Sequence, residues 1–483
     1  MREKGLKRVR TASAVIAALL FLGAFYALTT SPVAASVETE IVVDVGNITD
    51  LIWSSSGTRI AYVKCPDGQQ WGGLWVGDWN GHEVTNVQLL YTEVDGTRLE
   101  DWQGSWILFM IRHENGLPSE YYGRGELWKI RDDGTQLTQI TFTYTNGIRT
   151  EWWNPAYTNI GTANWGRFIP GTGFVYFSAH DGNGWWKAYT CNADGTDDWN
   201  LISGNTFSFT IGMSPTGNKL VWGTSWYWNQ PTTLMASNVD GTERITIRQF
   251  PFKTYPLVLA DGNTVVYSRP DGNIGAIQID GTADRVVIDD EYANYWANYD
   301  PVDGQSFLMS SNRDPDGNVH IFSVGVSGTE VFQLTDGPYN DDSPIYSPNG
   351  YCVLYRRLPV GSDTYTYELV IRWIAKQIEI DIKPGSECNP INLGSRGKTA
   401  VAVLTTSNFD ASTVNPVTVV FAQAVALRWN LEDVDGDGDL DLVLHFSTQS
   451  LELAIDSTEG ILTGFTFGWE LIEGRDSVRI VPP

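Results

Sequence analysis

Short apolar stretches joined by glycine-containing turns recur along most of the chain. One turn in each repeat joins two apolar stretches, and its glycines are Gly57, Gly104, Gly173, Gly217, Gly262, Gly304 and Gly350. A second turn, most often Asp-Gly, follows at Gly81, Gly134, Gly195, Gly241, Gly281 and Gly328. Two hairpin turns in a unit of about 45 residues predict four strands per unit, the pattern of a propeller blade. Glycine suits these turns because a tight hairpin needs a residue at positive φ.

The last repeat, from Ser343 to Trp373, has only three predicted strands. A further strand is available at the other end of the repeat region, where Thr39–Val45 reads Thr-Glu-Ile-Val-Val-Asp-Val. Pairing of this segment with the last repeat would close the ring and remove exposed sheet edges. The pattern therefore predicts an all-β protein with a seven-bladed β-propeller over residues 36–374, with six or eight blades as alternatives.

Three segments of the later repeats carry a family resemblance. Residues 311–317 (Ser-Asn-Arg-Asp-Pro-Asp-Gly), 334–337 (Leu-Thr-Asp-Gly) and 342–350 (ending Ser-Pro-Asn-Gly) resemble TolB-type, WD-like propeller repeats. Asn349 and Thr216 stand where that pattern usually has Asp. The first three units share only the spacing of predicted strands with the pattern. The resemblance implies the propeller fold. It leaves the function open, because such propellers serve as binding platforms, peptidase gates and lyase scaffolds.

The amino-terminal segment, residues 1–35, has the order of a secretory signal peptide. Five Lys and Arg residues precede the apolar stretch Ala14–Leu28, and the small residues Val33-Ala34-Ala35 follow. This order predicts export with cleavage near Ala35. The alternative is an uncleaved anchor, for which the apolar stretch is short, and no later segment is long enough to span a bilayer. We expect a secreted or extracytoplasmic protein, at the cell surface or in the periplasm.

Composition narrows the possible partners. The 483 residues include 57 Asp and Glu against 32 Lys and Arg, a net charge of −25, which argues against a nucleic-acid partner. A hydrophobic content of 42% argues against disorder. The four cysteines, widely spaced and without a Cys-x-x-Cys pair, leave open both disulfides and free thiols in an exported protein.

The propeller topology sorts the loops onto two faces. Both glycine turns of a unit lie on one face, whereas the loops between the second and third strands and the crossings to the next unit lie on the other, here called the loop-rich face. Long loops and an insertion, Thr143–Arg167, place aromatic residues there: Tyr121, Tyr122, Trp152, Trp153, Trp165, Trp226, Tyr227 and Trp228. Exposed aromatic rings beside charged side chains suit a glycan or a polypeptide partner. Packing between blades is the alternative role for each ring.

Signals for catalysis are few. No Gly-x-Ser-x-Gly motif occurs, which argues against an attached hydrolase domain. We place His113 and His180 on the loop-rich face and His82 and His320 off it, and no two of them have metal-ligand spacing. The sequence therefore assigns no catalytic residue.

A different pattern of strands occupies residues 375–483. Alternating segments predict strands at residues 378–382, 399–405, 417–421, 424–429, 440–446 and 477–481, enough for a small β-sandwich. Three segments, beginning Ile-Asp-Ile-Lys-Pro-Gly-Ser at Ile380, then 433–445, then Asp-Ser-Val-Arg at Asp476, resemble a module that recurs at the ends of secreted prokaryotic proteins.

The strongest chemical motif of the chain lies in this module. Asp433, Asp435, Asp437, Asp439 and Asp441 alternate with other residues in Asp-Val-Asp-Gly-Asp-Gly-Asp-Leu-Asp. Such a ring of oxygen ligands suits Ca²⁺, with carboxylates from Asp433, Asp435, Asp437 and Asp441 and the backbone carbonyl of Asp439. Strands are predicted on both sides, so the motif is similar to the strand-loop-strand calcium sites of integrin-type propeller repeats. A solvated acidic turn is the alternative.

Together these patterns predict an exported, noncatalytic propeller that binds a protein or polysaccharide partner through its loop-rich face and carries a calcium-stabilised terminal module. Two other functions stay open. One is a polysaccharide lyase or glycoside hydrolase on the same scaffold, and the other is a structural protein of the envelope or surface layer.

Overall fold

The computed structural model describes residues 39–481 apart from 67–71, 93–96, 113–124, 142, 146–147, 151–162, 181–185, 197–199, 203–207, 225–231, 252–253, 255, 270–272, 303 and 363–365. The chain divides into two compact units, residues 38–376 with 468–471 and residues 377–467 with 472–483. The described residues form β-strands and two short 3-10 helices, Ala411–Thr413 and Thr448–Ser450. None of these helices is long and apolar enough to cross a membrane. The predicted signal peptide lies outside the described residues.

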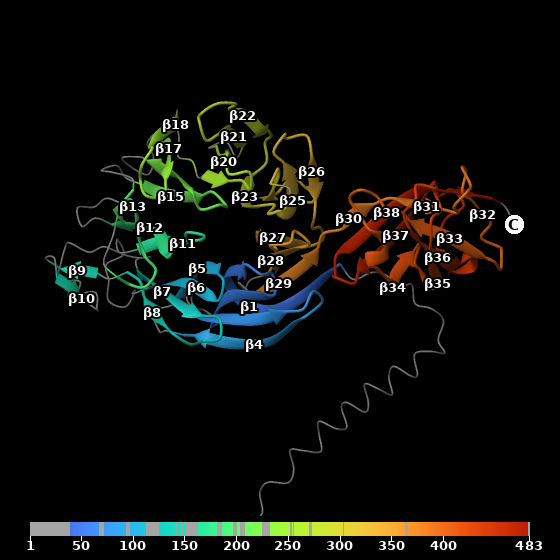
Figure 1. Ribbon diagram of the computed structural model, residues 1–483, viewed down its shortest axis with the longest axis horizontal. Helices are drawn as coiled ribbons and strands as arrows, with labels where there is room; N and C mark the ends of the chain where they lie inside the picture. The colour runs from blue at the N-terminus through green and yellow to red at the C-terminus, as the bar shows by residue number, and fades with distance from the viewer. Residues whose placement is uncertain are drawn as a thin grey trace, which may run out of the picture. The chain divides into compact units, whose positions relative to one another are not determined.

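The strands of the first unit are arranged around a common centre as a β-propeller (Figure 1). Three of its sheets are separate and have four antiparallel strands each, joined in sequence order. The first contains β15 (Ser208–Met213), β16 (Lys219–Thr224), β17 (Thr232–Asn238) and β18 (Ile245–Phe250). The second contains β19 (Pro256–Val258), β20 (Thr264–Ser268), β21 (Ile274–Gln278) and β22 (Arg285–Ile288). The third contains β23 (Asn294–Tyr299), β24 (Ser306–Ser311), β25 (His320–Gly325) and β26 (Val331–Gln333).

Two further sheets of the propeller are larger. One has the order β27-β28-β29-β1-β2-β3-β4, and the other has the order β14-β13-β12-β11-β7-β6-β5 with β8 paired to β7. Their first strands are β1 (Glu40–Trp53), β2 (Arg59–Cys65), β3 (Gly73–Trp79), β4 (Val84–Tyr91), β5 (Thr97–Gln103), β6 (Trp106–Arg112), β7 (Gly125–Arg131) and β8 (Thr138–Gln139). The remaining strands are β11 (Ala163–Phe168), β12 (Phe174–His180), β13 (Trp186–Asn192), β14 (Asn200–Leu201), β27 (Tyr339–Tyr346), β28 (Cys352–Pro359) and β29 (Tyr367–Trp373). A small ribbon pairs β9 (Thr143–Thr145) with β10 (Ile148–Thr150).

The long strand β1 closes the propeller. Its first part, from Glu40 to Gly46, pairs antiparallel with β29, and its second part, from Asn47 to Trp53, pairs with β2. The predicted pairing of the amino-terminal strand with the last repeat is therefore confirmed. It joins the beginning and the end of the repeat region in one sheet, which leaves no free edge at the closure.

The prediction of seven separate blades is wrong, because the described propeller strands form five hydrogen-bonded sheets besides the β9–β10 ribbon. The physical reason is that two connections merge neighbouring groups of strands. The continuous strand β1 belongs to two groups at once, and a pair between Ala163 and Gly125 joins β11 to β7. The repeated turns in the sequence predict local hairpins. They do not show whether neighbouring hairpins also share strands or hydrogen bonds.

The turn glycines have the predicted conformation at nearly every position. Gly57, for example, has φ of +70° and its N–H donates to the Ser54 carbonyl at 2.9 Å, which closes the turn between β1 and β2. In the third repeat the predicted turn glycine is wrong by two residues. Gly171, with φ of +72°, occupies the left-handed conformation there in place of Gly173. The second set of turn glycines all have positive φ.

Residues 376–480 hold the strands of the second unit and its boundary. One continuous sheet has the order β30-β38-β37-β34-β35-β36-β33-β31, and β32 and β39 form a parallel pair. The strands are β30 (Lys376–Ile378), β31 (Ile380–Ile382), β32 (Pro390–Ile391), β33 (Lys398–Val403), β34 (Val414–Phe421), β35 (Ala424–Glu432), β36 (Asp441–Ser447), β37 (Glu459–Thr466), β38 (Leu471–Ser477) and β39 (Arg479–Ile480). The predicted small β-sandwich is not shown. The strands follow one continuous order, in which β35 pairs with both β34 and β36.

Strand β37 was not predicted, because two glycines weaken its pattern. Both are required by close packing in the apolar core. A Cβ atom at Gly460 would lie 2.7 Å from the buried Phe421 ring, and one at Gly464 would lie 2.9 Å from a Val419 methyl group. The strand therefore forms where the backbone itself packs against neighbouring side chains.

Candidate functional site

The inner strands of the propeller enclose a cavity of about 570 Å³, here called the central cavity. Its walls include residues of β5, β11, β12, β15, β19 and β23, which are far apart in the chain. The polar residues that matter below are Arg98, Glu100, Asp101, Arg167, Tyr176 and Tyr299. Its volume is in the range of ordinary small-molecule sites.

Strand β5 brings two consecutive carboxylates to this cavity. Neighbouring residues of a regular strand point to opposite faces. The pairing of β5 with β6 shifts register between Leu99 and Asp101, which marks a bulge at Glu100. Bulges re-aim side chains, and both Glu100 and Asp101 line the cavity.

Each carboxylate is held by a backbone N–H of β11. The N–H of Gly166 donates to Glu100 Oε2 at 3.1 Å, and the N–H of Phe168 donates to Asp101 Oδ2 at 2.8 Å. Gly166 is suited to this position because a Cβ atom there would lie 2.8 Å from Leu127. The two groups of strands are thereby tied together at the cavity wall.

Two arginines accompany the carboxylates. Arg98 Nε lies 3.7 Å from Glu100 Oε1, and Arg167 Nη1 lies 3.6 Å from Asp101 Oδ1. The guanidinium groups are the more accessible partners: the Arg98 and Arg167 side chains are 30% and 50% exposed, against 5% and 17% for the carboxylates. The cavity therefore offers hydrogen-bond donors to a ligand, with the carboxylates behind them.

Burial changes the acidity of both carboxyl groups. Loss of solvation raises the pKa of Glu100 to about 7, although the nearby charges of Arg98 and Arg167 act in the opposite direction. Burial likewise raises the pKa of Asp101, and Arg167 opposes this shift. Glu100 Oε1 has no hydrogen-bond partner within the part of the chain that the structure describes. A carboxyl group with this pKa can exchange a proton near neutral pH.

The rim of the cavity includes residues of the turns between first and second strands, namely Ser55, Pro170 and Pro215. These turns lie on the face opposite to the predicted loop-rich face. Sequence reasoning missed this cavity. The available signal was the cluster of three charged residues in β5, Arg98, Glu100 and Asp101, at an inner-strand position where apolar residues are expected.

The aromatic residues predicted for the loop-rich face stay a prediction. Seven of the eight lie outside the described residues: Tyr121, Tyr122, Trp152, Trp153, Trp226, Tyr227 and Trp228. The backbone of Trp165 belongs to β11, but its side chain is outside the described part. Of the histidines, His320 is placed differently from our prediction, because it begins β25 directly after the loop from β24 and so belongs to the loop-rich face.

The aspartate loop, Asp433–Asp441, is the second candidate site. It joins β35 to β36, which confirms the predicted strand-loop-strand context. One carboxylate oxygen each from Asp433, Asp435 and Asp441 lies within 4.8 Å of the others, so these three side chains converge. Gly436 and Gly438 provide the bends, with φ of +81° and +101°.

Asp441 fixes the aspartate loop in place through backbone hydrogen bonds. It is fully buried, and its two oxygens accept the N–H groups of Thr405 at 2.8 Å and Val434 at 3.0 Å. The N–H of Asp437 donates a hydrogen bond to Asp435 Oδ1, which favours the ionised form of Asp435 and lowers its pKa. Loss of solvation and the negative charges of Asp437 and Asp441 outweigh it and raise the Asp435 pKa. A cation in the loop would relieve this repulsion.

The two other predicted ligands differ from this group of three. Asp437 Oδ1 accepts the N–H of Asp439 at 2.9 Å, and neither side chain belongs to the converging set. Calcium as the cation of this loop stays a prediction. The four cysteines, all within the described residues, form no disulfide with one another; Cys65, Cys191 and Cys352 are buried and Cys388 is exposed.

No family model matches the chain, and no curated protein sequence matches it. Among solved structures, the Cps50 propeller domain of Myceliophteria thermophila covers 70% of this chain and all of its own length, with 10% identity and a TM-score of 0.47. An oligogalacturonate lyase of Vibrio parahaemolyticus covers 84% of this chain and 98% of its own, with 12% identity and a TM-score of 0.41. A TolB-like protein of Agrobacterium tumefaciens covers 66% and 81%, with 13% identity and a TM-score of 0.32.

Proposed function

We infer that this chain is an exported propeller protein that binds a saccharide in its central cavity and is stabilised by calcium in its terminal module. The observation that carries the binding proposal is the pair of accessible guanidinium groups, Arg98 and Arg167, in front of two buried carboxylates. Guanidinium groups donate several hydrogen bonds in a fixed geometry, which suits ring hydroxyl and carboxylate oxygens of a sugar.

The composition of the cavity favours a small polar ligand over a polypeptide. The half-buried Tyr299 adds a ring and a hydroxyl group to the wall, and such a ring suits a sugar face. The cavity volume of about 570 Å³ fits a short oligosaccharide and is too small for a folded partner. A protein partner on the loop-rich face, as the aromatic pattern suggests, is compatible with this site.

The calcium proposal is supported by the convergence of Asp433, Asp435 and Asp441 in a loop bent by two glycines. Oxygen-only ligands suit a hard cation such as Ca²⁺, which accepts six to eight of them. Residues 1–35 suggest that the protein is exported. Calcium, which is abundant outside the cell, would then fill such a loop. The terminal module is then a stabilised appendage whose charge is neutralised when calcium binds.

The test is a glycan array with the mature chain, followed by calorimetry on the best neutral and acidic oligosaccharides. We expect R167M to weaken binding at least tenfold, because it removes donors without opening a cavity. The matched control is R244M, which replaces an arginine of the exposed turn between β17 and β18. Equal binding by wild type and R167M would disprove the cavity as the site, and no binding to any saccharide would disprove the function.

The second candidate function is catalysis on the same ligand, and the raised pKa of Glu100 favours it. In a lyase reaction, the ionised carboxylate would remove the proton next to a uronate carboxyl group, a C=C bond would form, and the glycosidic oxygen would leave and take up a proton. Arginine beside the uronate carboxylate would stabilise the developing charge. Release of an unsaturated product, seen by its ultraviolet absorbance and abolished in E100Q, distinguishes this function from binding alone.

A further inference from the structure

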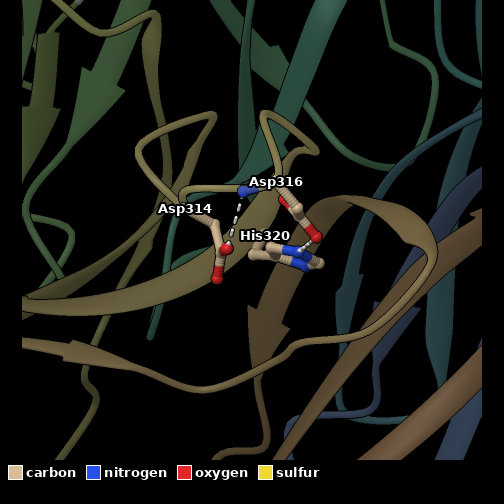
Figure 2. A group of neighbouring side chains, drawn as sticks. All are labelled: Asp314, Asp316 and His320. Atoms are coloured by element: carbon tan, nitrogen blue, oxygen red, sulfur yellow. Dashed lines mark hydrogen bonds and ion pairs between the residues drawn. The ribbon is translucent and has the colours of Figure 1, made fainter.

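Three side chains that can bind a metal converge at the loop between β24 and β25 (Figure 2). They are Asp314, Asp316 and His320, and one ligand atom from each lies within 4.8 Å of the others. Figure 2 shows the Asp316 carboxylate pointing toward the imidazole ring of His320. The site lies in the propeller, away from both the central cavity residues and the aspartate loop in sequence.

A tight turn fixes the two carboxylates. The N–H of Gly317, which has φ of +76°, donates to the Asp314 carbonyl at 2.8 Å. One oxygen of Asp314 accepts the N–H of Asp316 at 3.2 Å, and one oxygen of Asp316 accepts the N–H of Asn318 at 2.8 Å. The other oxygens accept side-chain amides of Gln333 and Asn318 at 2.6 and 2.7 Å. Each carboxylate still has lone pairs to offer, because it can accept about four hydrogen bonds.

His320 is fully buried, which is unusual for a histidine without a strong partner. Its Nε2 lies 3.5 Å from Asp316 Oδ2, at the limit of a hydrogen bond. Its Nδ1 lies 3.7 Å from Asp341 Oδ2, and neither of these two atoms has a hydrogen-bond partner among the described residues. The ring is therefore buried between carboxylates with its polar atoms poorly satisfied.

Asp341 lies behind the ring in the arrangement typical of metal-binding histidines. A histidine that binds a metal through one nitrogen commonly donates its other N–H to a carboxylate, which fixes the ring orientation. Asp341, fully buried on β27, faces Nδ1, while its other oxygen accepts Arg357 Nε at 3.0 Å. This leaves Nε2 of His320 directed toward Asp314 and Asp316 as the ligand atom.

We propose that Asp314, Asp316 and His320 form a binding site for a divalent transition-metal ion of the zinc class, with Asp341 as a positioning residue. One imidazole nitrogen and two carboxylate oxygens are the mixed ligand set that Zn²⁺ accepts, usually with water at the open position. Ca²⁺ and Mg²⁺ prefer oxygen ligands alone. The site is thus chemically distinct from the aspartate loop.

The site is connected to the closure of the propeller. Arg357, which holds Asp341, also contacts Glu40 of β1 through Nη1 at 2.6 Å. Glu40 belongs to the part of β1 that pairs with β29. A bound metal orients His320 and Asp341 and through them the residues at this junction. Metal binding should therefore raise the melting temperature of the propeller.

The test is calorimetry of the mature chain with Zn²⁺ in millimolar Ca²⁺, which keeps the aspartate loop occupied by its preferred ion. We expect one Zn²⁺ site, and a loss of at least 100-fold in affinity in the double variant D314N/D316N. D341N should weaken binding about 10- to 100-fold while the ligands remain. Co²⁺ in place of Zn²⁺ should give a visible absorption band in wild type that the double variant lacks.

D280N is the matched control, because Asp280 is an exposed aspartate in a turn of another sheet of the propeller. It should bind Zn²⁺ as wild type does. H320Q should also lose Zn²⁺ affinity, because it removes the imidazole ligand. If the buried glutamine prevents folding, the affinity of D314N/D316N alone tests the proposal. Absence of Zn²⁺ binding, or equal affinity in wild type and D314N/D316N, would overturn the proposal and leave the cluster as hydrogen-bonded side chains that bind no metal.

Discussion

Arg357 Nη1 lies 2.6 Å from Glu40 Oε1, although 317 residues separate the two in the chain. The pair belongs to the closing sheet, in which Glu40 begins β1 and Arg357 lies on β28. Burial lowers the stability of the charged Glu40 side chain, but its hydrogen bonds and attraction to Arg357 and Arg372 hold its pKa below the ordinary value. The two termini of the repeat region are thus joined by charge as well as by strand pairing.

Replacement of Arg357 by Met should destabilise the propeller by about 3 kcal/mol, because it leaves the buried Asp341 without its cation. Urea unfolding followed by tryptophan fluorescence would measure the change. K219M is the control, since Lys219 pairs with the exposed Glu243 and should contribute less than about 1 kcal/mol. Equal effects of the two substitutions would show that the closing pair has no special role.

The sequence was sufficient for features that depend on local chain geometry. The turn glycines and the strands on both sides of the aspartate loop were predicted because each needs only a few neighbouring residues. Even the closing strand could be predicted, since a repeat with three strands requires a fourth from elsewhere. These features follow from period and turn chemistry.

Features that depend on contacts between distant segments could not be predicted. Glu100 meets the N–H of Gly166 across 66 residues, and the charged wall of the central cavity exists only because of that approach. The number of sheets depends on whether neighbouring groups of strands share hydrogen bonds, as at Ala163 and Gly125. His320 and Asp341 come from adjacent sheets, so their spacing in the sequence resembles no metal motif.

Calcium should stabilise the terminal module through the aspartate loop. At a Ca²⁺ concentration 100 times the dissociation constant, we expect about 2.7 kcal/mol of added stability, seen as a higher melting temperature in calorimetry. The double variant D433N/D435N should lose this gain, because both side chains belong to the converging group. D439N is the matched control and should keep it, since Asp439 is predicted to bind through its carbonyl. Loss of the gain in D439N alone would refute this assignment of ligands.

The pKa of Glu100 predicts a pH dependence of propeller stability. Its value of about 7 in the folded protein exceeds the ordinary value of 4.5, so the folded state favours the protonated form. Its stabilising contribution is therefore complete below about pH 4.5 and is lost as the pH rises through 7. A difference of about 2.5 pH units corresponds to about 3 kcal/mol.

The comparison that isolates this contribution is wild type against E100Q at pH 4.5, 6 and 8. The free energy of unfolding of wild type, relative to E100Q, should fall by up to about 3 kcal/mol over this range. E330Q, at an exposed position, should show no such trend relative to wild type. A constant difference between wild type and E100Q at all three pH values would contradict the raised pKa.

The glycines of β37 provide a test of the packing in the terminal module. In G460A, the new methyl group would meet Phe421 at 2.7 Å and Ile382 at 2.9 Å, both fully buried. Because these side chains cannot move into solvent, we expect a loss of about 1 to 3 kcal/mol in the free energy of unfolding of the module. G397A is the control, since its methyl group would meet only the Ser395 hydroxyl at 3.1 Å on the exposed surface. If G460A were as stable as G397A in calcium-saturated calorimetry, β37 could not lie against Phe421 as described.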